Sequence, residues 1–414
     1  MSGMSGMSGI TDNGVGQRVR GTRKLRGWTQ ERLAQEVARY SDSVSLSLIR
    51  QVEQGRLPAS PSFTAACARA LEVAPGDLYE ETYPRTTPDE QKMHAGIPEI
   101  RRELAAYHLP PGDVPIRPFA DLARDVARAS QLRHLVKLGD LGRLLPPLLH
   151  DLRAARHSTT GPDEERIFGL LAETFAATSQ AVYKLGYTDL SSLAVDRYEW
   201  AAARSGDELA VLVGDYQRAG ELICVADFAA AERLLATSRS RLEDELHRGD
   251  QAILATYGNL HLKSALAAAR WGKRDAADVH LEEARQIAAR IGTDRDDYRL
   301  CFGPANVAIW SVGLAVESMD GTEAVKRSEN LRLPPETPRE RVGHHYIDLA
   351  RGHLLNGDRQ RAFAALQTAK KITPTQTRYH PMVRETVRTL ARQEARATDT
   401  VRGFAAWCGI THLD

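Results

Sequence analysis

Apolar and small residues recur at helical spacing through most of the chain, from about residue 118 onward. Five sets follow the spacing i, i+4, i+7, i+11, and each set ends three residues before a short turn. A small residue follows each turn by five positions, where a second helix can pack closely. The pattern predicts helix pairs that each bury one stripe. Their turns lie at Gly186, Ala226, Gly272, Met319 and Gly357, with a weaker sixth pair at Gly139.

The turns are 38 to 47 residues apart, so the helix pairs repeat with an irregular period. The pattern resembles a degenerate tetratricopeptide (TPR) array, lengthened beyond its usual ~34 residues. That resemblance implies a TPR-like α-solenoid over residues 118–414, with a concave inner face and closing helices at 380–395 and 399–408. A non-repetitive helical bundle stays open as the alternative, because the spacing is irregular.

Shorter helical segments precede this region, and each begins or ends at a suitable residue. Apolar spacing predicts a basic helix over residues 15–26, a helix over 30–38 capped by Thr29, and closing helices over 62–71 and 77–79. Between them, residues 44–56 form a helix capped by Ser45 and ended by Gly55. In that helix Ile49 and Val52 share a buried face. The opposite face carries Leu46, Ser47, Arg50 and Gln51.

Three of those four outward side chains are hydrogen-bonding groups of the kind that read base edges in the major groove of DNA. A plain surface helix can share this pattern, so the flanking residues decide. They resemble the Cro/repressor-type (XRE) helix-turn-helix family, in Arg23, Gly27-Trp28-Thr29-Gln30, Leu33-Ala34, Ser45, Ile49, Val52, Glu53 and Gly55. The connecting turn, residues 39–43, is about five residues longer than the tight turn of that family.

The resemblance implies a five-helix, lambda-repressor-like domain over residues 14–80. It implies that Arg23 and Glu53 form a buried ion pair and that Gln30 and Arg56 contact phosphates. It further implies that the DNA bases are read by Leu46, Ser47, Arg50 and Gln51.

Composition and charge agree with two functional parts. The 414 residues suffice for two or three domains. Residues 14–79 carry ten Arg and Lys against six Asp and Glu, a net charge of +4, whereas the whole chain is only +1. Positive charge therefore lies where phosphates would be met. Residues 1–13 are low in complexity and expected to be disordered, and residues 81–117 are expected to be a linker with a short helix.

No apolar run approaches the ~18 residues of a membrane helix, and no charged-then-apolar leader is present. The four cysteines are scattered without metal or redox spacing. We therefore expect a cytoplasmic protein without membrane association. No catalytic motif, metal-ligand spacing or cofactor motif occurs, so we expect neither an enzyme nor a metal or cofactor site.

Polar residues recur next to the buried stripe on the predicted inner face. A ladder of such side chains can hydrogen-bond an extended peptide or a polar small molecule. A solvated helix face is the alternative. Near the ladder, residues 302–304 interrupt a helix start, which either shapes a pocket or merely breaks the helix. The expected ligand-binding residues are Gln217, Asn259, Lys263, Asn306, Trp310 and His344.

Together the two regions resemble actinobacterial XRE regulators with a C-terminal TPR-like sensor. The resemblance implies a homodimeric transcription regulator that binds a double-stranded DNA operator and responds to a small-molecule or peptide effector. Two other classes stay open. One is a DNA-anchored adaptor whose solenoid binds a protein, and the other is a hydrolytic enzyme with its site in the concave face.

Overall fold

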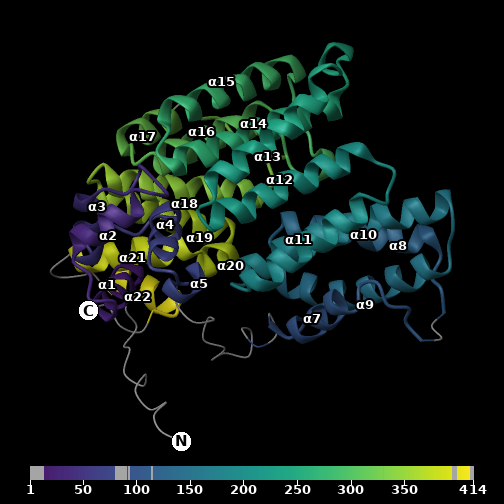
Figure 1. The fold of residues 1–414 in the computed structure, drawn as a ribbon, viewed down its shortest axis with the longest axis horizontal. Coiled ribbons are helices and arrows are strands. Elements are labelled where there is room, and N and C mark those ends of the chain that lie inside the picture. Colours follow the sequence, from purple (N-terminus) through teal and green to yellow (C-terminus); the bar gives the residue numbers. More distant parts are fainter. Residues whose placement is uncertain are drawn as a thin grey trace, which may run out of the picture.

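The computed structural model describes residues 14–79, 91, 94–112, 115–329, 331–393 and 399–410, in which every regular element is a helix (Figure 1). The expectation for residues 1–13 lies outside these ranges. The N-terminal helices are α1 (Val15–Leu25), α2 (Gln30–Val37), α3 (Leu46–Glu53), α4 (Pro61–Ala70) and α5 (Pro75–Leu78). In the segment expected to be a linker, α7 covers Ile97–Ala105.

The remaining helices follow one another with short connections. They are α8 (Phe119–His134), α9 (Leu138–His157), α10 (Pro162–Lys184), α11 (Thr188–Ala202), α12 (Glu208–Cys224), α13 (Phe228–Glu243), α14 (Gln251–Trp271), α15 (Arg274–Ile291), α16 (Pro304–Glu317), α17 (Gly321–Glu329), α18 (Arg339–Leu355), α19 (Arg359–Ile372), α20 (Pro374–Tyr379), α21 (Pro381–Gln393) and α22 (Asp399–Trp407). Two short 3-10 turns, Leu246–Arg248 and Asp297–Arg299, lie between them.

Capping hydroxyl groups start three helices of the N-terminal domain. Thr29, Ser45 and Ser60 each accept a hydrogen bond from the backbone N–H three positions on, at 3.1, 3.2 and 3.1 Å. These bonds satisfy donors that a helix start leaves unpaired. The domain core then forms from the inward apolar stripe of each helix, and its fully buried members include Val19, Leu33, Ile49 and Phe63.

From α10 onward the helices pair in sequence, α10 with α11, α12 with α13, α14 with α15, α16 with α17 and α18 with α19. The backbone is left-handed (φ from 59° to 94°) at the turn residues expected from the sequence, namely Gly186, Ala226, Gly272, Met319 and Gly357. The left-handed turn before α9 lies at Val136 rather than at Gly139. The first helices of the pairs, α12, α14, α16 and α18, pack one against the next.

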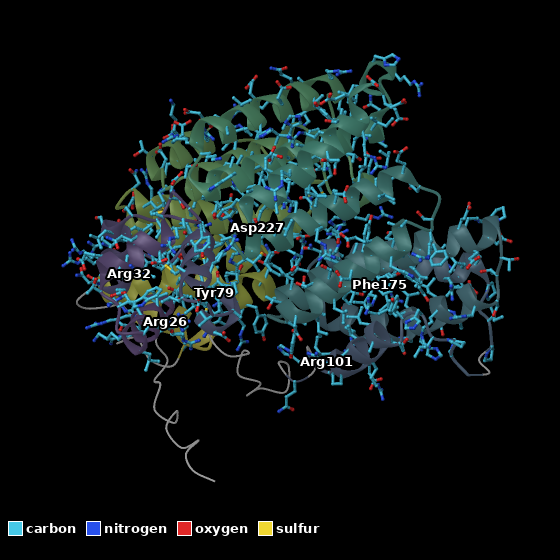
Figure 2. The ribbon with its side chains drawn as sticks, viewed as in Figure 1. Arg26, Arg32, Tyr79, Arg101, Phe175 and Asp227 are labelled. Carbon is cyan, nitrogen blue, oxygen red and sulfur yellow. The ribbon has the colours of Figure 1, made fainter. Side chains whose placement is uncertain are left out.

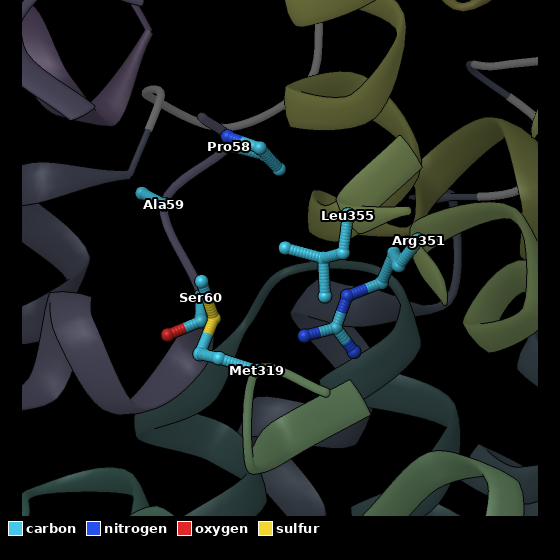
Figure 3. A pocket seen from close by; sticks show the side chains of 6 residues that line it. All are labelled: Pro58, Ala59, Ser60, Met319, Arg351 and Leu355. Atoms are coloured by element: carbon cyan, nitrogen blue, oxygen red, sulfur yellow. The ribbon is translucent and has the colours of Figure 1, made fainter. Parts of the chain in front are cut away.

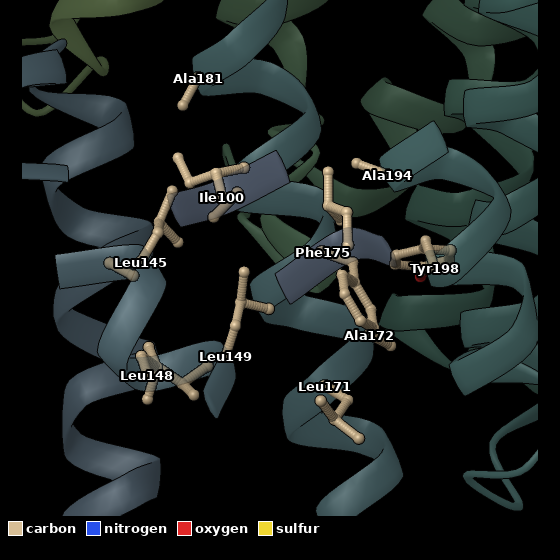
Figure 4. Packing of buried hydrophobic residues seen from close by; sticks show 14 of the residues in the cluster. Ile100, Leu145, Leu148, Leu149, Leu171, Ala172, Phe175, Ala181, Ala194 and Tyr198 are labelled. Atoms are coloured by element: carbon tan, nitrogen blue, oxygen red, sulfur yellow. The ribbon is translucent and has the colours of Figure 1, made fainter. Parts of the chain in front are cut away.

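Figure 4 shows the largest apolar cluster, at the end of the array that contains α7 to α11. Phe175 of α10 lies between the α9 side chains and Tyr198 of α11, and Ile100 anchors α7 against this layer. All three side chains are nearly inaccessible to solvent. The connecting segment is therefore fixed to the array by its own helix.

The array closes on itself, because its first helices contact α18. The buried carboxylate of Glu340 lies 2.6 Å from Nζ of Lys184 on α10 and 3.8 Å from Nη1 of Arg133 on α8. Burial alone would raise the pKa of Glu340, but Lys184 and Arg133 lower it overall. These ion pairs therefore connect the first helices of the array to α18.

The N-terminal domain packs against this array. In Figure 2, Arg26 and Arg32 lie on the outer side of the N-terminal domain, while Tyr79 lies toward the array. Ala65 of α4 belongs to the apolar cluster of α12 to α14, and Arg69 Nη1 donates to the carbonyl of Ala226 at 2.6 Å. The residues 58–60 meet Met319, Arg351 and Leu355, leaving a void of only about 10 Å³ (Figure 3). The two parts thus share a tightly packed contact.

A charged triad supports this contact from the array side. Glu317 lies 2.8 Å from both Arg270 Nε and Arg351 Nη1, and its side chain is buried. Burial opposes ionisation, yet Arg270 and Arg351 lower the pKa of Glu317 to about 2.

No helix among the described residues is long and apolar enough to cross a membrane.

Candidate nucleic-acid interface and inner face

A buried ion pair joins the first helix to α3. Arg23 Nε and Nη2 each donate to one carboxylate oxygen of Glu53 at 2.8 Å, and Nη1 donates to the Trp28 carbonyl at 2.6 Å. The hydrogen bonds to Glu53 raise the pKa of Arg23. This bidentate geometry fixes α3 relative to α1, because separating the two side chains would leave a buried charge without its partner and destabilise the fold.

The outward face of α3 carries the four expected base-reading residues. Ser47 and Arg50 are exposed, while Leu46 and Gln51 are half-buried. Arg50 Nη2 lies 2.6 Å from the Glu31 carboxylate, and Gln51 Nε2 donates to Ser47 Oγ at 3.1 Å. Both interactions are at the surface and are therefore weak enough to be exchanged for bonds to a base edge.

The two expected phosphate ligands both lie near the C-terminal end of α3. Gln30 Nε2 donates to Glu53 Oε2 at 2.7 Å, which ties Gln30 to the ion pair and leaves one N–H of its amide for a phosphate. The Arg56 side chain is exposed, and its backbone carbonyl accepts a hydrogen bond from Gln393 at 2.7 Å. Sequence reasoning did not foresee this contact with α21.

The long turn before α3 contacts the end of α14. The backbone N–H of Asp42 donates to the Trp271 carbonyl at 3.1 Å, and Ser43 Oγ donates to the Arg270 carbonyl at 3.0 Å. These carbonyls belong to the last turn of α14, where helices lack internal partners. The departure from a tight turn noted in the sequence therefore coincides with an interdomain contact.

The six expected ligand-binding residues lie on consecutive first helices. Gln217 is on α12, Asn259 and Lys263 are on α14, and the remaining three are Asn306 and Trp310 on α16 and His344 on α18. Lys263 Nζ lies 4.0 Å from the ring centroid of Tyr216, and among the described residues no carboxylate forms an ion pair with it. The structure thus places these six residues on four helices that pack one against the next.

Three of these residues carry a buried polar atom with no hydrogen-bond partner in the described part of the chain. They are Asn259 Oδ1, Gln217 Oε1 and His344 Nδ1, and the Asn259 side chain is only 3% exposed. Leaving such an atom unpaired typically costs about 1–3 kcal/mol. Burial also lowers the pKa of His344 to about 3, so its ring is neutral at physiological pH.

Asn306 differs from the others because the chain itself satisfies it. Its amide nitrogen donates to the Cys301 carbonyl, and its Oδ1 accepts a hydrogen bond from Arg341 Nε at 2.8 Å. Arg341 also lies over the Trp310 ring, 5.6 Å from its centroid. The sequence reasoning missed Arg341.

The sequence did indicate the interruption at residues 302–304. There Phe302 packs so closely on α14 that a Cβ on Gly258 would lie 2.0 Å from its ring.

Comparisons with known proteins concern the N-terminal part. Residues 15–81 match the family model described as a helix-turn-helix domain. Comparison of the chain with curated proteins and with solved structures found no match. The match covers the helices that hold the Arg23–Glu53 pair and the exposed face of α3. Residues 15–81 are therefore a helix-turn-helix domain of the XRE-like type, which implies DNA binding.

Proposed function

We propose that the chain is a sequence-specific transcription regulator whose C-terminal helical array, TPR-like in its paired helices, receives a signal. The observation that carries this proposal is the double role of α14. Its middle bears Asn259 and Lys263, while its last turn accepts the hydrogen bonds of the turn before α3. A ligand that shifts α14 would therefore shift the start of α3, the helix that we expect to contact the DNA bases.

The distances make such coupling reasonable. Asn259 and Trp271 are twelve residues apart on one helix, which is about 18 Å at 1.5 Å per residue. A rigid helix can transmit a displacement over this length, and coupling between two sites is typically worth about 1–3 kcal/mol. The effector would be a peptide or small molecule with N–H or O–H donors, because the unpaired atoms of Asn259 and Gln217 are acceptors.

The active species is proposed to be a homodimer. Helix-turn-helix proteins of this kind read two half-sites about one helical turn of DNA apart, roughly 34 Å. A net charge of +4 on residues 14–79 is modest for one domain, and two copies double it. We assign no catalytic step to the chain.

The reading face is tested on an operator selected with the wild-type protein. Arg50→Ala and Gln51→Ala should each weaken specific binding by about 1–3 kcal/mol, while binding to random DNA changes little. Arg69→Ala is a matched control, because Arg69 lies on the interdomain side of the domain. If both variants bind the operator as tightly as the wild type, α3 is not the reading helix.

The sensor role is tested by adding a low-molecular-weight extract of the source cells to the protein–operator complex. Asn259→Ala should remove the change in affinity that the extract causes, and should leave the affinity without extract unaltered. Gln251→Ala, at the start of the same helix, serves as the control. A fully responsive Asn259→Ala protein would refute ligand binding at this residue.

A further inference from the structure

We propose that His134, Asp296 and Cys301 form a binding site for a divalent transition metal ion of the zinc type. His134 ends α8, whereas the other two residues lie in residues 293–303, the connection between α15 and α16 that we call the strap. A bound ion would fasten the strap to the first helix of the array. This inference does not depend on the proposed regulatory function.

The three donor atoms are already gathered. His134 Nε2 lies 2.9 Å from Asp296 Oδ2, and Cys301 Sγ lies 3.2 Å from Asp296 Oδ1. One nitrogen, one oxygen and one sulfur atom lie within 4.8 Å of one another. Zinc bonds of about 2.0–2.3 Å in tetrahedral geometry place neighbouring ligand atoms roughly 3.3–3.8 Å apart. Small side-chain adjustments would therefore suffice.

The surroundings of the His134 ring favour a metal on Nε2. This nitrogen is 2.9 Å from a carboxylate and also 3.1 Å from Arg133 Nη2, so it faces an acceptor and a donor and satisfies only one of them. Nδ1 is buried without a hydrogen-bond partner, 4.0 Å from the carboxylate of Glu340. A metal on Nε2 places the ring proton on Nδ1, where Glu340 can accept it, as carboxylates do behind metal-bound histidines.

The charges around the cluster are compatible with a dication. The ion would be neutralised by the Asp296 carboxylate and the Cys301 thiolate. Arg299 lies 2.9 Å from Glu173 and 3.7 Å from Asp296, so it stays paired. Arg133 Nη2 contacts both His134 Nε2 at 3.1 Å and the Arg299 carbonyl at 2.6 Å, and metal binding would require it to give up the contact with the ring.

The strap is held in a conformation that places Cys301 at the cluster. Three of its residues, Tyr298, Arg299 and Cys301, have positive φ values of 50°, 60° and 44°. Residues with side chains adopt this left-handed conformation at a cost in free energy, which the contacts at the strap tip must offset. One of these is the hydrogen bond of Tyr298 to Asp207, at 2.8 Å. A metal bond would add to them.

Metal binding at this cluster would release a proton. Burial and the Asp296 carboxylate raise the pKa of the Cys301 thiol, so the free cluster holds a protonated sulfur. The ion would displace that proton to water and bind the thiolate. His134 also lines a surface depression of about 340 Å³, through which an ion could enter and a water could complete the coordination.

The test is a titration of the full-length, EDTA-treated protein with Co²⁺ under reducing conditions. We expect one equivalent to bind with the near-ultraviolet charge-transfer band of a cobalt–thiolate bond, and Zn²⁺ to displace it. Cys301→Ser should abolish the band and weaken Zn²⁺ binding at least tenfold. Cys224→Ser, which alters the half-buried cysteine of α12, should leave both unchanged.

His134→Gln keeps all four cysteines and guards against a misfolded Cys301→Ser protein. It should retain the helical circular dichroism spectrum and bind both Co²⁺ and Zn²⁺ at least tenfold more weakly than the wild type. The proposal is overturned if the wild type shows no cobalt–thiolate band, if the band survives Cys301→Ser, or if His134→Gln binds Zn²⁺ as tightly as the wild type.

Discussion

At the scale of single residues, Glu53 holds the helix-turn-helix domain together. Its carboxylate accepts two bonds from Arg23 and one from Gln30, from two different helices, and its side chain is only 2% exposed. A buried carboxylate with one missing partner costs far more than a missing surface pair. The orientation of α3 therefore depends on this one residue.

Glu53→Ala and Arg23→Ala should each destabilise the domain by about 3–5 kcal/mol, because each leaves an uncompensated buried charge. The double variant should cost clearly less than the sum of the two. Hydrogen exchange of residues 46–53, followed against urea, measures this effect locally. Strictly additive losses would mean that the two side chains do not stabilise each other.

The resemblance to the XRE helix-turn-helix family predicted this pair, but nothing in the sequence predicted the polar contacts inside the array. Arg23 and Glu53 fall within a compact pattern of 33 residues, whereas Arg133 and Glu340 are separated by about half the chain. Nothing local in either segment indicates the other. The role of Asn306 was unpredictable for the same reason, since its amide is satisfied by Arg341 and the strap rather than by solvent.

At the scale of helices, close backbone approach decides where α1 can lie. A Cβ on Gly16 would be 2.2 Å from the carbonyl oxygen of Val52, so α1 and α3 nearly touch there. Gly21, one and a half turns further along α1, faces open space. The same helix therefore offers a test position and a matched control.

Gly16→Ala should destabilise the domain by about 1–3 kcal/mol, because α1 must move away from α3 to admit the methyl group. Gly21→Ala should stabilise it by about 0.5–1 kcal/mol through helix propensity alone. Thermal unfolding of both variants provides the comparison. Equal effects of the two substitutions would contradict the close approach.

Helix ends were the best-predicted elements. Thr29 and Ser45 cap α2 and α3 as expected, because a capping hydroxyl acts on its own neighbours three residues away. The five turn residues were also found from the repeat pattern alone. Ala226 and Met319 among them carry side chains despite positive φ, so residue type would not have identified those two turns.

At the scale of the whole molecule, the helix-turn-helix domain packs directly against the array. It is not merely connected to the array by a linker. The sequence suggested a linker and separate domains. The contact is made by helix-end carbonyls and by residues as small as Ala65 and Gly272, which leave no recognisable pattern. Only the longer turn before α3 marked the region in the sequence.

Two glycines test the contact between the helix-turn-helix domain and the array. Both end a helix with their backbone in the left-handed region. A Cβ on Gly272 (φ 94°) would lie 2.7 Å from the Ser43 backbone nitrogen, whereas one on Gly292 (φ 76°) meets nothing within 4 Å. Gly272→Ala should therefore increase hydrogen exchange in residues 39–44, and Gly292→Ala should not. Unchanged exchange in both would exclude a persistent contact between the domains.

Stability should depend on pH through the buried histidines. Burial lowers the pKa of both His261 and His344 to about 3, while an unfolded chain keeps it near 6.5. Protonation of these histidines therefore favours the unfolded state. The free energy of unfolding has its full value above pH 6.5 and decreases as the pH drops toward 3. At pH 5 each histidine should cost about 1–2 kcal/mol.

The melting temperature between pH 7 and pH 5 measures this effect. His344→Gln should flatten the dependence, whereas His247→Gln, at an exposed position, should leave it as in the wild type. A slope that both substitutions leave unchanged would exclude His344 as its source.

The central claim is that α3 reads DNA sequence, and selection from a random double-stranded pool tests it most directly. The full-length protein should enrich one short motif, arranged as two half-sites about one helical turn apart. A protein carrying both Arg50→Ala and Gln51→Ala should fail to enrich it. If the folded wild-type protein enriches no sequence over the starting pool, the account is wrong.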